Sequence, residues 1–398
     1  MKISDILGTK PRPDRNSRRR AKHRAKSDNL YSVSIDSLNE GADARIQHIE
    51  DLVLWKGIQG AKEALSTLRQ LETNTNDVTI KWDGSPAVIF GRNERGEFVL
   101  TDKAGFGASG YDGKVTSAND LAKMLGNRKQ KEPDPNRPAF IEQMRKVWPK
   151  FEAATPPDFR GYVHGDLLYF DTPKAAKGRL IFQPNTTQYS VDGKSDIGKK
   201  IANSTAGVVL HAHIDLDGNT SDVDASRFLP GELLIMPPAV VSHTPEIDVP
   251  ELDRLEDIIN KSGGAITKLL TVPEELRMKQ FNNFLYTYIN NSAKAGDLND
   301  WSLQNFASWV DRSKLSNAAK QKAVQWAQSN EAGFVALFDI IHGIMKVKND
   351  IIRELDSKPA EIQATTGGKP GGEGYVIGRD RKLVNRDEFT RNNMQRQR

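Results

Sequence analysis

The sequence predicts an α+β protein, an antiparallel-sheet core that carries an inserted all-helical module. Three observations lead to this prediction. Short runs of branched and aromatic residues, separated by Gly, Pro and Asp turn signals, fill residues 78–236 and are typical of strands joined by turns. Apolar residues at spacings of three and four dominate residues 249–358 and indicate helices. Strand patterns then return at residues 373–386.

These patterns divide the 398 residues into four segments. They are a basic arm at residues 1–40, a first core segment at 41–245, a helical module at 246–364, and the last strands with a tail at 365–398. The chain is long enough to bury a sizeable core, and its 37% apolar and 27% charged residues are ordinary for a globular protein.

The composition excludes several classes of protein and site. No window of 18 uninterrupted apolar residues is present, so the sequence predicts no membrane-spanning helix and no membrane partner. The start of the chain is too polar for the apolar segment of a signal peptide, which favours a cytoplasmic location. The absence of cysteine rules out disulfides, thiolate nucleophiles and cysteine-ligated zinc.

Positive charge is concentrated at the N-terminus. Residues 1–26 contain ten Lys or Arg against two Asp, a balance of +8 within a total formal charge of +5, so the rest of the chain sums to −3. With little to bury and strong self-repulsion, this arm is expected to be disordered when free and to bind the phosphate backbone of nucleic acid. A solvated tail or an assembly signal is the alternative.

Lysine 81 is the first candidate for chemistry. The run Val-Thr-Ile-Lys-Trp-Asp-Gly predicts a short strand that delivers Lys81 to a turn at Asp83 and Gly84, followed by a hairpin of residues 87–92 and 97–102. A lysine held at a strand end suits an amine nucleophile. The alternative for the four residues alone is an ordinary strand that runs into a surface turn.

Other side chains sit in positions that suit a binding site. Lys103 precedes a glycine-rich stretch where backbone can approach a ligand closely. Asp166 lies inside an apolar strand at residues 161–170, where a carboxylate must be paired, hydrogen-bonded or metal-bound. His211 and His213 alternate on a strand, so we expect them on one face, either as metal ligands or in cross-strand packing.

Several expected elements connect these candidates. Helices are expected as a hairpin at residues 41–71, at 117–154 with a break at 132–135, and at 195–204. The glycine-rich run at residues 365–372 is expected to be a flexible linker. A second hairpin follows at residues 373–386 and carries Glu373 and Lys382. Because the chain returns to strand so late, we expect these last strands to complete a central sheet.

The order of these motifs resembles the covalent nucleotidyltransferase superfamily of ATP-dependent DNA and RNA ligases and mRNA capping enzymes. The resemblance is closest to phage RNA-ligase-like proteins, and Asn385 and Phe389 follow the last motif as in phage ligases that seal duplex RNA. The matching stretches are Lys81-Trp82-Asp83-Gly84 (motif I), Lys103-Ala104-Gly105 (in place of Arg-x-Gly), Gly165-Asp166-Leu167 (motif III), Glu373-Gly374-Tyr375-Val376 (motif IV) and Lys382-Leu383-Val384 (half of the Lys-x-Lys of motif V).

The resemblance implies an adenylyltransferase core that uses ATP and Mg²⁺. Lys81 would be the catalytic nucleophile that forms lysyl-AMP, Asp166 and Glu373 would hold the metal, and His213 would stack on the base. The remaining nucleotide-binding residues implied are Asp83, Gly84, Lys103, Lys382 and Arg386. Val384 replaces a lysine that touches the α-phosphate in the family, so Arg381 or Arg386 would have to substitute.

The expected function is an ATP-dependent polynucleotide ligase with RNA as the acceptor and nucleic acid ends or nicks as the partner. If a phage encodes the chain, the location is the host cytoplasm. One alternative is a catalytically silent nucleotidyltransferase fold that binds nucleic acid or virion components. Another is nucleotidyl transfer to a different acceptor, such as an RNA 5′ end or a protein.

Overall fold

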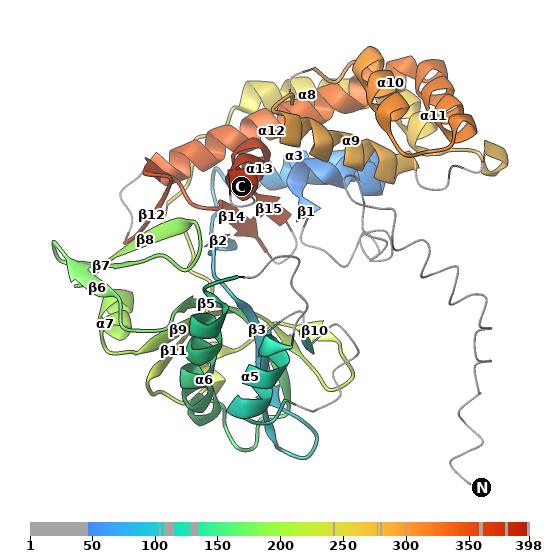
Figure 1. Cartoon of the computed structure of the whole chain (residues 1–398). Helices are drawn as coiled ribbons and strands as arrows, with labels where there is room; N and C mark the ends of the chain where they lie inside the picture. The colour runs from blue at the N-terminus through green and yellow to red at the C-terminus, as the bar shows by residue number, and fades with distance from the viewer. Residues whose placement is uncertain are drawn as a thin grey trace, which may run out of the picture.

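The computed structural model describes residues 47–102, 105–106, 115–127, 134–241, 243–276, 278, 281–298, 300–357, 361–378 and 381–395. It confirms the α+β class, because three sheets that are mainly antiparallel combine with helices of very different lengths. Figure 1 shows the long helices gathered at one end of the molecule and a separate sheet with two helices at the other.

The first sheet joins the two ends of the described chain. Its strands, in spatial order, are β1 (Gln47–His48), β15 (Arg381–Leu383), β14 (Tyr375–Ile377) and β2 (Val78–Ile80). β14 is antiparallel to both β15 and β2, whereas β1 runs parallel to β15. The predicted hairpin at residues 373–386 is therefore confirmed, and it pairs directly with the strand that precedes Lys81.

The second sheet follows the predicted strands closely. Its order is β10 (Thr220–Ser221), β9 (Ala206–Ile214), β5 (Gly161–Tyr169), β3 (Ala87–Arg92) and β4 (Phe98–Asp102), with β11 (Leu233–Met236) parallel to β9. One face is covered by α5 (Ala118–Gly126) and α6 (Arg137–Ala154), and the side chains between them form a continuous apolar core. The predicted helical region at residues 117–154 is confirmed, and the predicted break at 132–135 falls between its two helices.

The third sheet contains a correction. Its order is β13 (Lys369–Pro370), β12 (Ile362–Thr366), β8 (Thr187–Asp192), β7 (Arg179–Phe182) and β6 (Lys174–Ala176). The expectation of a flexible linker at residues 365–372 is wrong, because β12 and β13 form a hairpin and β12 pairs along the whole of β8. Gly367 (φ 60°) and Gly368 (φ 79°) supply the two left-handed residues that a two-residue hairpin turn requires.

The helices complete the architecture. Besides α5 and α6, the α-helices among the described residues are α3 (Leu52–Gln70), α7 (Asp196–Ala202), α8 (Val249–Leu270), α9 (Phe281–Ala295), α10 (Leu303–Arg312), α11 (Asn317–Ser329), α12 (Glu331–Ser357) and α13 (Arg386–Gln395). The 3-10 turns η2 (Ile49–Asp51), η3 (Ala225–Arg227) and η4 (Glu274–Leu276) accompany them. The predicted helical pair at residues 41–71 corresponds, within the described residues, to η2 and α3, and α3 is itself two helical segments joined across a kink at Gly57 (φ 57°).

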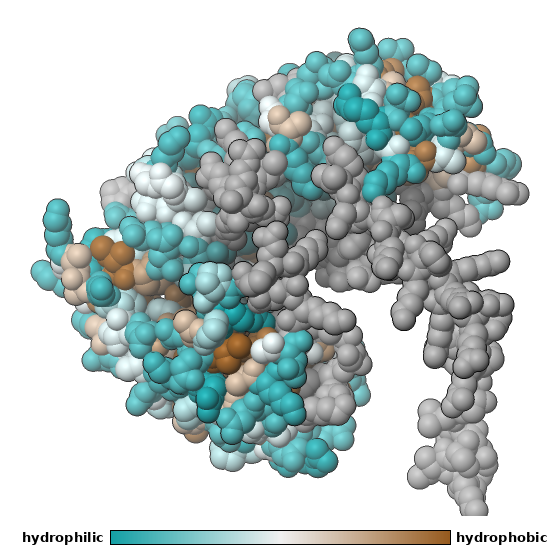
Figure 2. Space-filling view, viewed as in Figure 1, coloured by the Kyte–Doolittle hydropathy of each residue, from teal (hydrophilic) through white to brown (hydrophobic). Residues whose placement is uncertain are grey.

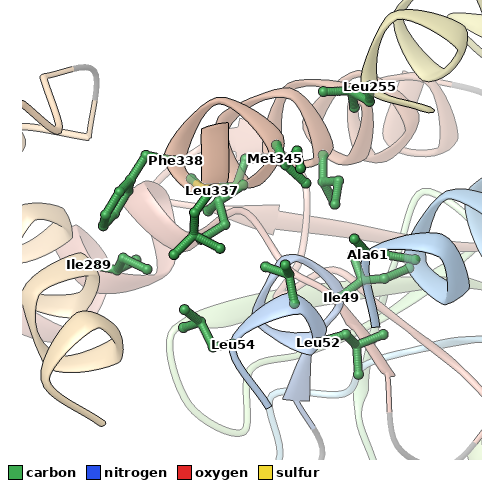
Figure 3. Packing of buried hydrophobic residues seen from close by; sticks show 14 of the residues in the cluster. Ile49, Leu52, Leu54, Ala61, Leu255, Ile289, Leu337, Phe338 and Met345 are labelled. Carbon is green, nitrogen blue, oxygen red and sulfur yellow. The ribbon is translucent and has the colours of Figure 1, made fainter. Parts of the chain in front are cut away.

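The helical module shares its core with the first sheet. Apolar side chains of α3, α8, α9 and α12 pack together, and residues of β2, β14 and β15 belong to the same buried cluster. Figure 3 shows part of this packing, with Ile49, Leu52 and Ala61 below the long helix that carries Leu337 and Met345. The boundary expected at residue 246 is thus no boundary between hydrophobic cores.

A buried ion cluster ties this shared core together. Lys348 of α12 donates to Glu50 (Nζ to Oε1, 2.7 Å), and Arg386 of α13 donates to Glu50 (3.2 Å) and Asp51 (2.5 Å). Arg386 also donates to Asn290 of α9 at 2.8 Å. Burial alone would raise the pKa of Glu50, but Lys348 and Arg386 outweigh it and lower that pKa. The cluster therefore fixes three helices and the chain before α3 in one arrangement.

We expect Lys348→Met to reduce the free energy of unfolding by about 3 kcal/mol, because removing one partner leaves buried carboxylates poorly compensated. Lys346→Met is the matched control, since Lys346 lies two residues away on α12 with about half of its side chain exposed, and it should change stability by less than about 0.5 kcal/mol. Urea denaturation at pH 7.5 measures both. Equal effects of the two substitutions would show that the buried cluster does not stabilise the fold.

Candidate functional site

The first sheet brings Lys81 to Glu373, 292 residues further along the chain. β2 and β14 pair Ile80 with Tyr375, and the ladder continues as the Lys81 amide donates to the Gly374 carbonyl at 2.9 Å. The Lys81 ammonium forms an ion pair with the Glu373 carboxylate. About a quarter of the Lys81 side chain is exposed. The two strongest sequence candidates therefore lie in direct contact, at a position that solvent reaches.

Asp83 is held by a ring of donors. Its carboxylate accepts from Asn185 Nδ2 (2.7 Å), from the Thr186 amide and hydroxyl (both 2.8 Å) and from the Thr187 amide (2.9 Å). The Asp83 amide donates to the hydroxyl of Tyr189 at 2.6 Å. Burial raises the pKa of Asp83, but these hydrogen bonds outweigh burial and leave it lowered. Asp83 thus fixes the turn after Lys81, and nothing in the sequence spacing pointed to its partners.

Glu373 has the opposite electrostatic balance. Burial raises its pKa, Lys81 opposes this, and the carboxylate of Asp83 together with a hydrogen bond between the two carboxyl groups raises it further. The net result is a raised pKa. Two neighbouring carboxyl groups whose pKa values move apart are typical of sites where one stays ionised and the other exchanges a proton.

Lys382 lies on the next strand of the same sheet. It pairs with Val376 of β14 on one side and with His48 of β1 on the other. Burial lowers the pKa of Lys382, and the charge of Lys81 lowers it further. Two lysines and Glu373 thus cluster on adjoining strands. Val384, at the position where the ligase resemblance would require a second lysine, is buried.

The C-terminal helix α13 lies over the nucleophile candidate. The Phe389 ring centroid is 5.9 Å from Lys81 Nζ, within the range of a cation–π contact. Figure 1 shows α13 above β14 and β15, close to the long helix α12. The residues that follow the last motif therefore contribute directly to the surroundings of Lys81.

Asp166 and Gly84 lie next to each other. β3 and β5 pair Ala87 with Asp166, and a Cβ added at Gly84 would stand 2.4 Å from the Asp166 Cβ. Gly84 is therefore needed for close approach, since any side chain would clash with β5. His211 Nε2 contacts the Asp166 carboxylate at 2.9 Å. The sequence flagged His211 only as a companion of His213, so this pairing was missed.

The expectation that His211 and His213 share one face is wrong. The ladder between β5 and β9 shifts register between His164 and Gly165, and His213 then stands opposite Val163, which belongs to the core under α5 and α6. His213 Nδ1 lies 3.3 Å from the Ser221 hydroxyl, and its ring packs edge-on against Phe159. His213 therefore lies on the face of the second sheet opposite to Asp166, and does not stack on a base bound beside it.

The side chains of Arg386 and Arg381 both donate hydrogen bonds to residues outside the Lys81 site. Every side-chain nitrogen of Arg386 donates within the buried cluster of Glu50, Asp51 and Asn290. Arg381 donates to Glu63 of α3, at 2.6 Å from Nη2. Arg386 therefore stabilises the folded core and cannot reach a bound phosphate, since only 2% of its side chain is exposed. Lys103 and the basic arm at residues 1–40 lie outside the described residues.

Metal binding is restricted by the geometry. Among the residues that the structure describes, no three His, Asp or Glu side chains are grouped at metal-ligating distances. Mg²⁺ bound together with a nucleotide needs only one or two carboxylates, because phosphates and water complete its shell. Glu373 could serve in that way, whereas the Asp83 carboxylate already accepts four hydrogen bonds from residues 185–187.

Comparison with known proteins places the chain in a family. A family model described as "Family of unknown function (DUF6267)" matches residues 43–398. The chain belongs to the DUF6267 family. No curated protein and no solved structure matches it. The match includes Lys81, Asp166, Glu373 and Lys382 but not the basic residues 1–26.

Two cavities adjoin the site of the DUF6267 protein. A small one of about 30 Å³ lies beside Glu373 and Phe389, and a wide one of about 680 Å³ lies beside Ile80 and Trp82. Since side chains alternate along a strand, the wide cavity faces away from Lys81. Asp356 of α12 lines both and accepts a hydrogen bond from the Tyr375 hydroxyl at 2.8 Å.

Figure 2 shows the outer surface on the viewing side of Figure 1. Hydrophilic residues cover most of the described part of this face, and hydrophobic residues lie in small separate patches. No helix among the described residues is both long and apolar enough to cross a membrane.

The protonation of Asp356 should make the stability of the protein depend on pH. Burial raises its pKa from 3.8 to about 6, so the folded protein favours the protonated carboxyl. Its contribution to stability is present below pH 3.8 and is lost as the pH rises through 6. We expect Asp356→Asn, which mimics the protonated group, to be more stable than the natural protein at pH 8 by up to about 3 kcal/mol.

Urea denaturation between pH 4 and 8 tests this expectation. The difference between Asp356→Asn and the natural protein should shrink below pH 6 and nearly vanish at pH 4. Asp350→Asn, a partly exposed carboxylate on the same helix, is the matched control and should show no such trend. A destabilised Asp356→Asn at pH 8 would mean that the ionised carboxylate is the favoured form.

Proposed function

We propose that this DUF6267 protein is an ATP-dependent nucleotidyltransferase that forms lysyl-AMP at Lys81 and acts as a polynucleotide ligase, with RNA as the acceptor. One observation carries the proposal: Lys81 and Glu373, the two most specific motif residues, form an ion pair across β2 and β14. Lys382 on β15 adds a second cation beside them. Motif residues that lie far apart in the sequence are thus close together in space, as a ligase-like site would need.

The chemistry at Lys81 begins with removal of a proton. Only the neutral amine is nucleophilic, and Glu373, whose pKa is raised by burial and by Asp83, is the base in contact with it. The Lys81 nitrogen attacks the α-phosphorus of ATP, so a P–N bond forms and the P–O bond to the β-phosphate breaks. Pyrophosphate leaves with the electron pair of that bond. Mg²⁺, which Glu373 could help to hold together with the phosphates and water, would supply positive charge beside the phosphates.

The surrounding residues bind and orient rather than react. Lys382 stabilises negative charge that develops on the α-phosphate. Asp83, fixed by its four hydrogen bonds, holds the turn so that Lys81 keeps one direction. In the ligase reaction the AMP then moves from Lys81 to a 5′-phosphate end. A 3′-hydroxyl attacks that end, forms the phosphodiester and releases AMP.

A catalytically silent nucleotidyltransferase fold that binds nucleic acid or virion components is the second candidate. The specific observation in its favour is Val384, which is buried at the position where nucleotidyltransferases have a phosphate-binding lysine. Arg381 and Arg386, the possible substitutes, are paired with other residues. Transfer of the nucleotide to another acceptor, such as an RNA 5′ end or a protein, shares the first step with ligation. Labelling of Lys81 separates the silent fold from both transferases, and transfer of the label to an acceptor separates ligation from the other transferase.

We expect the natural protein, incubated with Mg²⁺ and α-labelled ATP, to acquire label that survives denaturation and is stable to base but labile to acid. Lys81→Ala should lose at least about 99% of this label, because it removes the nucleophile. Glu373→Gln should lower the labelling rate by about 100-fold or more, because the amide neither accepts the proton nor supports a metal. Lys199→Ala, at an exposed lysine on α7, is the control and should label normally.

The outcome decides between the candidates. Label on Lys81→Ala would remove the proposed nucleophile. No label on the natural protein with ATP or GTP, from material that intact mass shows to be unmodified, would favour the silent fold. Label that transfers to a nicked RNA duplex would support ligation, and label that transfers only to another acceptor would support the other transferase.

The basic arm generates a prediction for nucleic acid binding. Deleting residues 2–26 removes a balance of +8. We expect the deletion to weaken binding of a nicked RNA duplex by at least about tenfold at 0.1 M salt and to flatten the dependence of affinity on salt, because fewer counterions are released. Fluorescence anisotropy at several salt concentrations measures both. Lysyl-AMP formation should be unchanged, and an unchanged affinity would remove the arm from the nucleic acid interface.

A further inference from the structure

Strand β9 carries one extra residue at His211. The ladder with β5 pairs Ala212 with His164 and Leu210 with Gly165, which leaves His211 without a partner in the ladder. This is a β-bulge, and a bulge re-aims a side chain relative to the regular alternation of the strand. Here it separates His211 from His213 and turns it toward the face of the sheet that carries Asp166.

His211 and Asp166 form a carboxylate–imidazole pair. The Nε2–Oδ2 distance is 2.9 Å, and because a carboxylate oxygen accepts, Nε2 is the donor. In the neutral ring, Nδ1 is then a hydrogen-bond acceptor. Nδ1 has no hydrogen-bond partner among the described residues, and 31% of the His211 side chain is exposed. The ring of His164, 5.3 Å away between centroids, lies against its side.

This pair lies beside the Lys81 turn. Gly84 packs directly on Asp166, and the Ser85 amide donates to the Leu167 carbonyl at 2.8 Å. Gly84, which touches Asp166, is three residues from Lys81, so the part of β5 that carries Asp166 adjoins the turn that follows Lys81. A nucleotide whose α-phosphate meets Lys81 brings its neighbouring groups, the other phosphates and the ribose, into this region.

The charge of the pair selects between those groups. A carboxylate with a neutral imidazole offers acceptors and negative charge, so it repels phosphate oxygens. The ribose hydroxyls are the donors closest to the α-phosphate. We propose that Asp166 orients His211 so that His211 Nδ1 accepts a hydrogen bond from a ribose hydroxyl of the bound nucleotide, which makes His211 a specificity residue for ribonucleotides.

The proposal rests on the function proposed above and adds a residue that the motif order does not contain. It also explains how a shorter carboxylate is tolerated at Asp166, where the family has glutamate. The imidazole extends the reach of the carboxylate by more than the missing methylene. Asp166 then acts through His211, and is a positioning residue for the ribose contact.

The test compares the rate of Lys81 labelling with ATP, 2′-deoxy-ATP and 3′-deoxy-ATP at subsaturating concentrations. The natural protein should favour ATP over one of the two deoxy analogues by about tenfold, and that analogue identifies the hydroxyl. His211→Ala should slow the ATP reaction by about tenfold and leave the reaction of that analogue unchanged, so the ratio falls to about one. A merely structural role would slow all three nucleotides together.

Three further variants test whether the preference for ATP depends on His211. His211→Gln, whose amide can donate to Asp166 and accept from a hydroxyl, should recover part of the ratio. Asp166→Asn should lower the ratio, because the ring loses the carboxylate that orients it. His213→Ala is the matched control, two residues away on the opposite face, and should keep the full ratio.

The possible failures are distinguishable. Normal labelling with a ratio that His211→Ala does not change overturns the role of His211 and leaves the nucleotidyltransferase standing. An equal loss of the ratio in His213→Ala also overturns it, because the effect would then belong to the strand. Absence of any label on the natural protein overturns the nucleotidyltransferase and the ribose contact together. Thermal unfolding of each variant ensures that folded proteins are compared.

Discussion

The pairing of β14 with β2 is the contact on which the rest of the structure depends. It joins strands almost 300 residues apart, and closing so long a loop costs conformational entropy that three residue pairs cannot offset alone. The offset comes from burial, because β2, β14 and β15 share one apolar core with α3, α8, α9 and α12. The helical module is therefore more than an insertion, since its packing holds Glu373 against Lys81.

The buried ion cluster refines this arrangement rather than creating it. Glu50 and Asp51 precede α3, Lys348 lies within α12 and Arg386 begins α13, so one set of ion pairs joins three separate segments. Buried ion pairs contribute little net stability compared with apolar packing, but leaving one member unpaired is costly. Such a cluster penalises any other docking of α13, and α13 carries Phe389 to Lys81.

The sequence predicted elements whose signals are local. The Lys81 turn, the strand at residues 161–169 and the helices at 118–126 and 137–154 follow from side-chain periodicity and turn residues, which act over a few positions. It missed the hairpin at residues 362–370, because two neighbouring glycines suit a linker and a tight turn equally well, and only pairing with β8 decides.

The candidate site shows the same division. Motif order predicted that Lys81 and Glu373 belong to one nucleotide site. The donors around Asp83 instead come from residues 185–187, where spacing gives no sign of them. Arg386 was expected at a phosphate because it follows motif V, but the acidic pair that captures it stands more than 330 residues earlier. Alternation predicted that His211 and His213 share one face of a strand, and one inserted residue in β9 places them on opposite faces.

The electrostatics of Lys81 explain why the carboxylates around it must differ. A lysine paired with a fully ionised glutamate would remain an ammonium and could not attack phosphorus. Asp83 alters this balance, because its own charge is stabilised by hydrogen bonds and it disfavours a second charge on Glu373. In the proposed reaction, Glu373 is thereby able to take the proton that Lys81 must lose. The ring of donors around Asp83 would then act on Lys81 through Glu373, without any contact to the nucleotide.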